Sequence, residues 1–118
     1  MNLRIVLDPA FGPFQRGSRL AGTVHAQDGG AARSVDAWLE FAEYAPEFRH
    51  VAARTEPVRL HEGPVPAGHT LRLALRIPPD ALPSLETEWG ALRWTLVVRA
   101  DRALRPDVRA EVEIEVRA

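Results

Sequence analysis

The histidines are the first side chains of this chain to consider for chemistry. There are four of them, and His50, His61 and His69 fall in the stretch that holds the long loops. Three imidazoles could form a zinc site in which water takes the fourth position. The spacing does not favour this, because paired ligands normally sit close together on one strand or helix. We therefore expect surface or hydrogen-bonded histidines and no metal site.

The serines and carboxylates form no hydrolase pattern. None of Ser18, Ser34 and Ser84 stands in the glycine-flanked turn of a nucleophile elbow, and there is no cysteine. Glu86 and Glu88 could act as an acid–base pair, but in a loop or edge strand a solvated charge is the ordinary role. The single Gly-Gly pair also lacks the pattern of a phosphate-binding loop. We predict no enzyme, no catalytic residue and no cofactor.

The three tryptophans differ in their surroundings. Trp94 falls on the apolar face of an alternating stretch and is expected in the core. Trp38 falls on the opposite face of its stretch, and Trp89 lies near a loop. Exposed tryptophans are common anchors of interfaces, so we predict protein contacts at Trp38, Trp89 and Tyr44. The alternative for Trp38 is a cover from the N-terminal segment or from a long loop at 45–50.

The elements that must position these residues are strands. Apolar residues alternate with polar ones in six stretches: Leu3–Leu7, Leu20–Ala26, Val35–Phe41, Leu71–Ile77, Leu92–Ala100 and Val108–Val116. A further strand is expected in Val51–Leu60. A period of two with one apolar face is typical of antiparallel sheets, and the spacing of the stretches is that of sandwiches. We predict an all-β, two-sheet antiparallel β-sandwich of immunoglobulin-like type, in which Pro57 marks an edge or a break.

One segment, Ala31–Glu47, can be read in two ways. It is rich in alanine and glutamate, and Ser34 could cap a helix there. The alternation through Phe41 and the preceding Asp28-Gly29-Gly30 turn favour a strand.

Charged residues should line the outer faces of the sheets. Glu111, Glu113 and Glu115 share one face of the last strand, and we expect them to pair with arginines such as Arg93 and Arg99 on the neighbouring strand. Such cross-strand pairs contribute about 0.2–1 kcal/mol each.

The composition sets the class of protein. With 118 residues, of which 46% are apolar, we expect a single domain over residues 1–118. The net charge is −1, from 15 basic and 16 acidic residues, so we expect no nucleic-acid or anionic-membrane surface. No stretch reaches the about 18 apolar residues of a membrane span. The absence of cysteine fits a cytoplasmic location.

Three segments together resemble the arrestin-like fold family, which includes arrestins and bacterial sporulation-control proteins. They are Phe14–Val24, with an aromatic, a glycine turn and a strand; Leu71–Ser84, with a strand and a proline-framed loop; and Gly90–Asp101, with a glycine and an alternating strand. The resemblance implies an adaptor or scaffold that works through protein contacts. Arrestins carry two sandwiches, and this chain has room for one. Phosphate-sensing arrestins also use paired lysines near the first strand, where this chain has only Arg4.

The function that we expect is therefore a non-enzymatic protein-interaction module with an unknown partner. The alternative is a sandwich that binds a small ligand or carbohydrate by stacking on Trp38, Trp89 and Tyr44. We also predict that the first strand or the Val51–Leu60 region lies at an open sheet edge, where pairing could form a homodimer.

Overall fold

The computed structural model describes all 118 residues of the chain, in strands connected by turns and loops. The strands are β1 (Leu3–Leu7), β2 (Phe14–Gln15), β3 (Arg19–Ala26), β4 (Ser34–Ala45), β5 (Phe48–Arg54), β6 (Val58–Glu62), β7 (His69–Arg76), β8 (Leu85–Thr87), β9 (Gly90–Asp101), β10 (Val108–Ile114) and β11 (Val116–Arg117). The predicted all-β class is confirmed.

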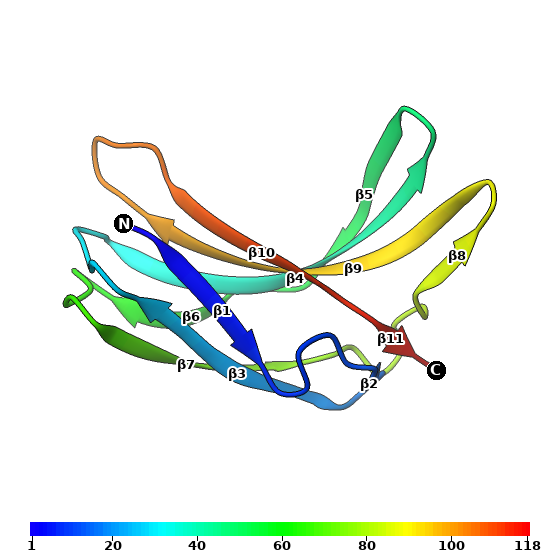
Figure 1. The fold of residues 1–118 in the computed structure, drawn as a ribbon, viewed down its shortest axis with the longest axis horizontal. Helices are drawn as coiled ribbons and strands as arrows, with labels where there is room; N and C mark the ends of the chain where they lie inside the picture. The colour runs from blue at the N-terminus through cyan, green and yellow to red at the C-terminus, as the bar shows by residue number, and fades with distance from the viewer.

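Two antiparallel sheets face each other (Figure 1). The smaller sheet has the strand order β1-β3-β7. The larger sheet has the order β10-β9-β4-β5, with β6 also paired to β4 and β8 also paired to β9. A short parallel pair, β11 with β2, joins the C-terminal segment to the start of the chain. The predicted two-sheet sandwich is confirmed.

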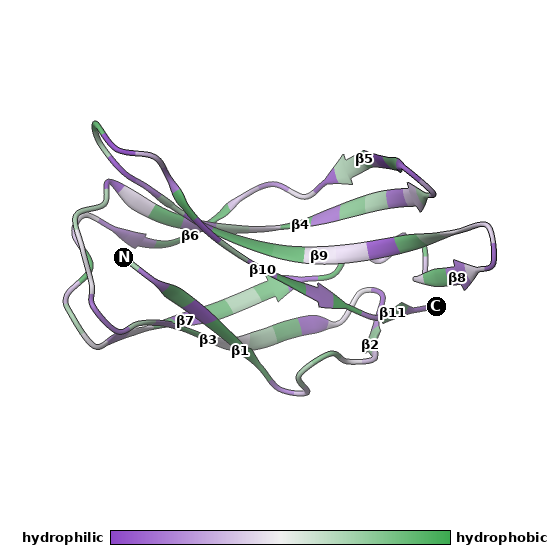
Figure 2. Ribbon diagram, turned by 45° about the horizontal axis from the view of Figure 1, so that its top comes forward, coloured by the Kyte–Doolittle hydropathy of each residue, from purple (hydrophilic) through white to green (hydrophobic).

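The inner faces of the two sheets form one cluster of 23 buried residues. Leu20 and Leu73 come from the smaller sheet, and Leu39 and Leu96 come from the larger one. Green apolar segments recur along β3, β7 and β9 in Figure 2, as a period of two requires when one face of each strand is buried. Trp94 is 4% exposed and packs on Phe41 with ring centroids 5.0 Å apart, so its predicted core position is confirmed.

The segment that the sequence left open between helix and strand is the central strand β4. It pairs with β9 from Ser34↔Asp101 to Tyr44↔Ala91. In a helix, the apolar residues at every second position would spread over all sides; in β4, Val35 and Leu39 reach the core together.

Two expectations for the middle of the chain are wrong in detail. The Val51–Leu60 region belongs to two strands, β5 and β6, and not to one, whereas the break predicted at Pro57 is confirmed because it lies between them. Residues 45–50 form a tight hairpin and not a long loop: β4 ends at Ala45 and β5 begins at Phe48. Glu47 has a φ of 62°, the left-handed conformation that lets the chain reverse in so few residues.

Both regions predicted to lie at sheet edges do so. Strand β1 ends the smaller sheet, and β5 and β6 share one edge of the larger sheet along β4. The homodimer through such an edge stays a prediction.

Candidate functional site

Two hairpins of the larger sheet, β4–β5 and β8–β9, extend beyond the smaller sheet at one end of the molecule (Figure 1). Strand β4 is buried from Ser34 to Ala42 and exposed at Glu43, where the covering sheet ends. The apolar side chains beyond that point therefore have no second layer to pack against.

The tips of these hairpins form an apolar cleft, which we call the hairpin cleft. It has a volume of about 290 Å³, and Tyr44, Phe48, Leu85, Trp89 and Leu92 are among its lining residues. Trp89 is 77% exposed, Phe48 56% and Leu85 52%. Exposed aromatic and aliphatic side chains around one hollow are a typical setting for an interface anchor.

Local chemistry holds the two hairpins together. A Cβ atom at Gly90 would collide with the carbonyl oxygen of Tyr44, so glycine permits the close pairing there. The Thr87 hydroxyl donates to the Gly90 carbonyl oxygen at 3.2 Å and accepts from the Trp89 backbone N–H at 3.2 Å. The side chain of Thr87 thus closes the turn that carries Trp89.

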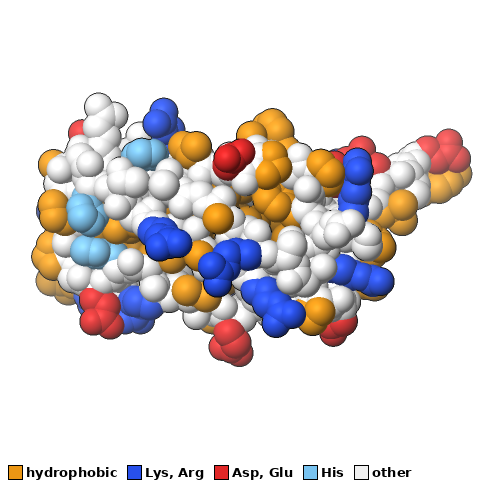
Figure 3. Space-filling view, turned by 90° about the horizontal axis from the view of Figure 1, so that it is seen from below, with side chains coloured by type: hydrophobic (Ala, Val, Ile, Leu, Met, Phe, Trp, Pro, Cys, Tyr) orange, Lys and Arg blue, Asp and Glu red, His pale blue; other side chains and the backbone are white.

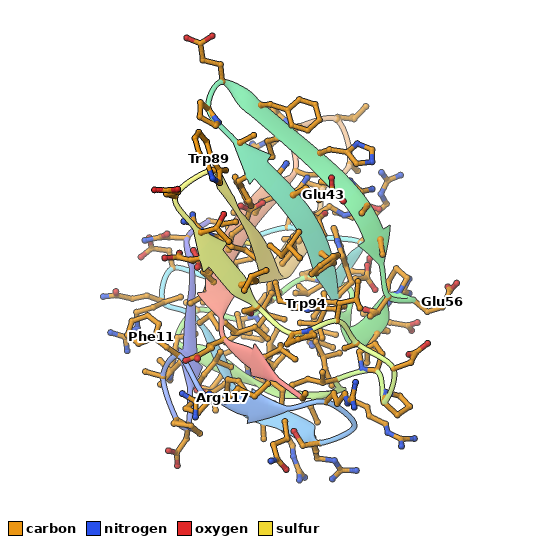
Figure 4. The ribbon with its side chains drawn as sticks, turned by 90° about the vertical axis from the view of Figure 1, so that its right-hand side faces the viewer. Phe11, Glu43, Glu56, Trp89, Trp94 and Arg117 are labelled. Atoms are coloured by element: carbon orange, nitrogen blue, oxygen red, sulfur yellow. The ribbon has the colours of Figure 1, made fainter.

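The surroundings of the hairpin cleft are acidic. Glu43 lines it, and Figure 4 shows Glu43 and Trp89 on the two neighbouring hairpins. Glu43, Glu47 and Glu88 are exposed and make no ion pair, whereas Glu86 is paired with Arg93 at 2.9 Å. Three uncompensated carboxylates give this end of the molecule a negative potential.

Tyr44 lies at the border between the cleft and the outer face of the larger sheet. The guanidinium carbons of Arg49 and Arg93 lie 5.7 Å and 5.1 Å from the centroid of its ring. Nε of Arg49 donates to the Tyr44 hydroxyl at 3.1 Å, and this hydrogen bond raises the pKa of Arg49. The structure brings Tyr44 and Trp89 together at the cleft, as two of the three predicted contact residues.

The third, Trp38, is elsewhere and is not exposed. It lies on the outer face of the larger sheet but is only 6% exposed. Arg99 and Arg109 cover its ring, with guanidinium carbons 5.2 Å and 5.7 Å from the ring centroid. The expectation of an exposed ring is wrong for Trp38, and the cover is neither the N-terminal segment nor residues 45–50.

A buried carboxylate beside Trp38 explains this arrangement. Glu40 is 2% exposed and accepts a hydrogen bond from Nε1 of Trp38 at 3.0 Å. Its carboxylate lies 3.2 Å from Arg54 and 3.6 Å from both Arg49 and Arg109. Arg109, one of the arginines that neutralise Glu40, is also one of the two that shield Trp38 from solvent.

A second buried carboxylate on this face is held in the same way. Asp36 is 6% exposed, accepts from the Ser34 hydroxyl at 3.0 Å and pairs with Arg59 at 2.8 Å. The hydrogen bond to Asp36 raises the pKa of Arg59. The outer face of the larger sheet is thus a layer of paired charges.

The other residues considered for chemistry have structural surroundings. The rings of His61 and His69 lie 5.6 Å apart, whereas His50 stacks on Phe48. No group of three or more histidine or acidic side chains is arranged to hold a metal ion. The Ser84 hydroxyl accepts from the backbone N–H of Val116 at 3.0 Å.

No protein-family model matches this chain, and no curated protein sequence does. Among solved structures, the chain is similar to Spo0M, a sporulation control protein from Bacillus subtilis, with a TM-score of 0.74. The fold is arrestin-like. Sequence identity is 18%, and the match covers 98% of this chain and 49% of that one. The chain therefore spans about half the length of its structural neighbour.

The arrestin-like sandwich contains the three segments that carried the sequence resemblance. They correspond to β2 with β3, to β7 with the following loop, and to β9. The resemblance in fold is confirmed. The structure contains no helix long and apolar enough to span a membrane.

Sequence reasoning missed Phe48 and Leu85 as cleft residues. The signal for Phe48 was present, since an aromatic directly after the Pro46-Glu47 turn belongs to a hairpin tip. Leu85 carried no comparable signal, because its three-residue strand is too short for an alternation to be recognised.

Proposed function

We propose that this chain is a protein-interaction module of arrestin-like type, an adaptor or scaffold whose contact surface is the hairpin cleft. The observation that supports it best is Trp89, 77% exposed in a cleft lined mainly by apolar residues. Burial of an apolar side chain of this size is favourable by about 2 kcal/mol or more, and the isolated chain does not gain this free energy at Trp89. A partner that covers the cleft recovers that contribution.

The charge around the cleft specifies the partner further. The carboxylates of Glu43, Glu47 and Glu88 have no partner within the chain. A segment that places an aromatic or aliphatic residue in the cleft and lysine or arginine beside it would satisfy both the apolar surface and these carboxylates. We propose such a basic, apolar protein segment as the ligand of the hairpin cleft.

The test is selection from a displayed library of random peptides, followed by titration of the selected peptides against purified variants. We expect selection to converge on peptides that combine an apolar anchor with basic neighbours. Trp89→Ala should weaken their binding at least about tenfold. Leu104→Ala is the matched control, because Leu104 is fully exposed in the β9–β10 loop, and it should leave the affinity unchanged.

Selection without convergence on that pattern would refute the proposal. Equal binding by wild type and Trp89→Ala would refute it too, since the cleft would then not be the contact surface.

A small-ligand or carbohydrate site is the second candidate, and the aromatic rings of Trp89 and Phe48 at the same cleft favour it. Sugars commonly stack on such exposed rings, as aromatic faces offer apolar contact. Titration with mono- and disaccharides should then change the tryptophan fluorescence of the wild type and not of Trp89→Ala. Unchanged fluorescence with all of the sugars removes this candidate.

A further inference from the structure

The outer face of the smaller sheet carries positive charge without any counter-charge. Strands β1, β3 and β7 contain four arginines and no aspartate or glutamate. These four, which we call the basic face, are Arg4, Arg19, Arg72 and Arg76. All of them are exposed, and none makes an ion pair. Figure 3 views the molecule from this side, with arginines spread across the middle and acidic side chains mostly near the rim.

The register makes this arrangement costly for the isolated chain. Arg19 and Arg76 stand directly opposite each other on β3 and β7, and like charges in that position are destabilising. Nε of Arg76 donates weakly to the Gly17 carbonyl oxygen at 3.4 Å, which leaves the charge uncompensated. Every arginine in the strands of the larger sheet is ion-paired, whereas every arginine in the strands of the smaller sheet is unpaired.

The rest of this face is small and neutral. Ala21, Thr23 and Ala74 project between the arginines, and His25 is engaged with the hydroxyls of Thr23 and Thr70 at 3.3 Å and 3.0 Å. Val6 of β1, 43% exposed and opposite Thr23, is the one larger apolar side chain on this face. Four unpaired arginines surround a single valine and no exposed aromatic ring, so recognition at this face depends mainly on charge, unlike recognition at the hairpin cleft.

The spacing of the arginines fits an extended chain. Arg72 and Arg76 lie four residues apart on one side of β7, which corresponds to about 13 Å along a strand. Acidic side chains at positions i and i+4 of an extended segment have the same separation and the same side. Guanidinium groups can bind such carboxylates with two parallel hydrogen bonds.

We propose that the basic face binds an extended acidic protein segment with aspartate or glutamate at alternate positions. The sheet bows outward on this side (Figure 1), so a flexible chain can follow it, whereas a planar bilayer or a DNA duplex would meet only a narrow strip. This surface lies apart from the hairpin cleft and goes beyond the function proposed for that cleft.

The experiment is fluorescence anisotropy with a labelled peptide of alternating glutamate and alanine, with an alternating lysine and alanine peptide as the negative control. The variant R72Q/R76Q should bind the acidic peptide at least about tenfold more weakly than the wild type. The matched control is R102Q/R105Q, which removes the same charge from two unpaired arginines of the β9–β10 loop. Its affinity should change by less than about twofold.

Two further measurements separate this surface from others. Trp89→Ala should bind the acidic peptide as the wild type does, because the hairpin cleft is not involved. Vesicles of phosphatidylcholine and phosphatidylserine in equal parts, and duplex DNA, should bind more weakly than the peptide. The proposal is overturned if the acidic peptide does not bind, if R102Q/R105Q weakens binding as much as R72Q/R76Q, or if vesicles or DNA are preferred.

Discussion

The outer faces of the two sheets each hold a pair of arginines directly opposite one another, in contrasting surroundings. On the larger sheet, Arg99 stands opposite Arg109, and the ring of Trp38 lies beneath both. On the smaller sheet, Arg19 stands opposite Arg76 with no aromatic ring and no carboxylate. The repulsion between opposite arginines is compensated within the chain on the larger sheet and is not compensated on the smaller sheet.

The compensation on the larger sheet extends over its whole width. Arg109 reaches Glu40 at 3.6 Å, and Arg99 reaches Asp107 at 3.9 Å. All six arginines of the larger sheet's strands make ion pairs, namely Arg49, Arg54, Arg59, Arg93, Arg99 and Arg109. An arginine's role is therefore set by whether its own sheet supplies carboxylates: paired arginines stabilise the fold, and unpaired ones are available to a partner.

The largest change in stability is expected when the buried charge of Glu40 is removed. Glu40→Gln leaves Arg49 and Arg54 without a carboxylate and Arg109 with Glu111 alone. We expect the free energy of unfolding to fall by about 2–3 kcal/mol. This is below the about 3–5 kcal/mol of a fully buried pair, because the arginines are half-exposed and partly solvated. Chemical denaturation followed by tryptophan fluorescence measures it.

Glu43→Gln, on the same strand but exposed and unpaired, is the control for Glu40→Gln and should stay within about 0.5 kcal/mol of the wild type. Equal losses for the two variants would contradict a stabilising role of the paired layer.

A matched charge reversal on each sheet should give effects of opposite sign. Arg54→Glu places a second carboxylate beside that of Glu40 and should lower the free energy of unfolding by about 1–2 kcal/mol. Arg19→Glu sets a carboxylate opposite Arg76 and should stabilise by about 0.5–1 kcal/mol. Thermal unfolding of the two variants in one buffer measures both. A loss of stability in Arg19→Glu would mean that the basic face is not strained by its own charge.

The smallest expected effect is the response to salt. The gain from Arg19→Glu should shrink by a few tenths of a kcal/mol between about 0.05 and 0.5 M sodium chloride, because exposed charges are screened. The loss from Glu40→Gln should change less, since burial protects that carboxylate from screening. Denaturation curves at both salt concentrations check this, and an equal salt response of the two variants would erase the distinction between the faces.

The strands and the core followed from the sequence because a buried face imposes a period of two. Leu71–Ile77, Leu92–Ala100 and Val35–Phe41 were each recognisable from the sequence, and Trp94 was correctly placed in the core. The break at Pro57 was predicted, because proline cannot donate a hydrogen bond within a sheet. The tight turn at Glu47 was not, since a turn depends on a few residues and leaves no period. The expected pairing of Glu113 with Arg93 is present at 3.6 Å.

What the sequence could not determine is which charges meet. The alternation shows that Trp38, Arg72 and Arg109 point away from the core, but strands distant in the sequence become neighbours only in the folded sheet. Tertiary structure alone placed Arg109 over Trp38 and beside Glu40, and left Arg72 on a face without carboxylates. Which side chains of a strand face the core follows from its own alternation, whereas the pairing of charges on the outer faces depends on the order and register of the strands.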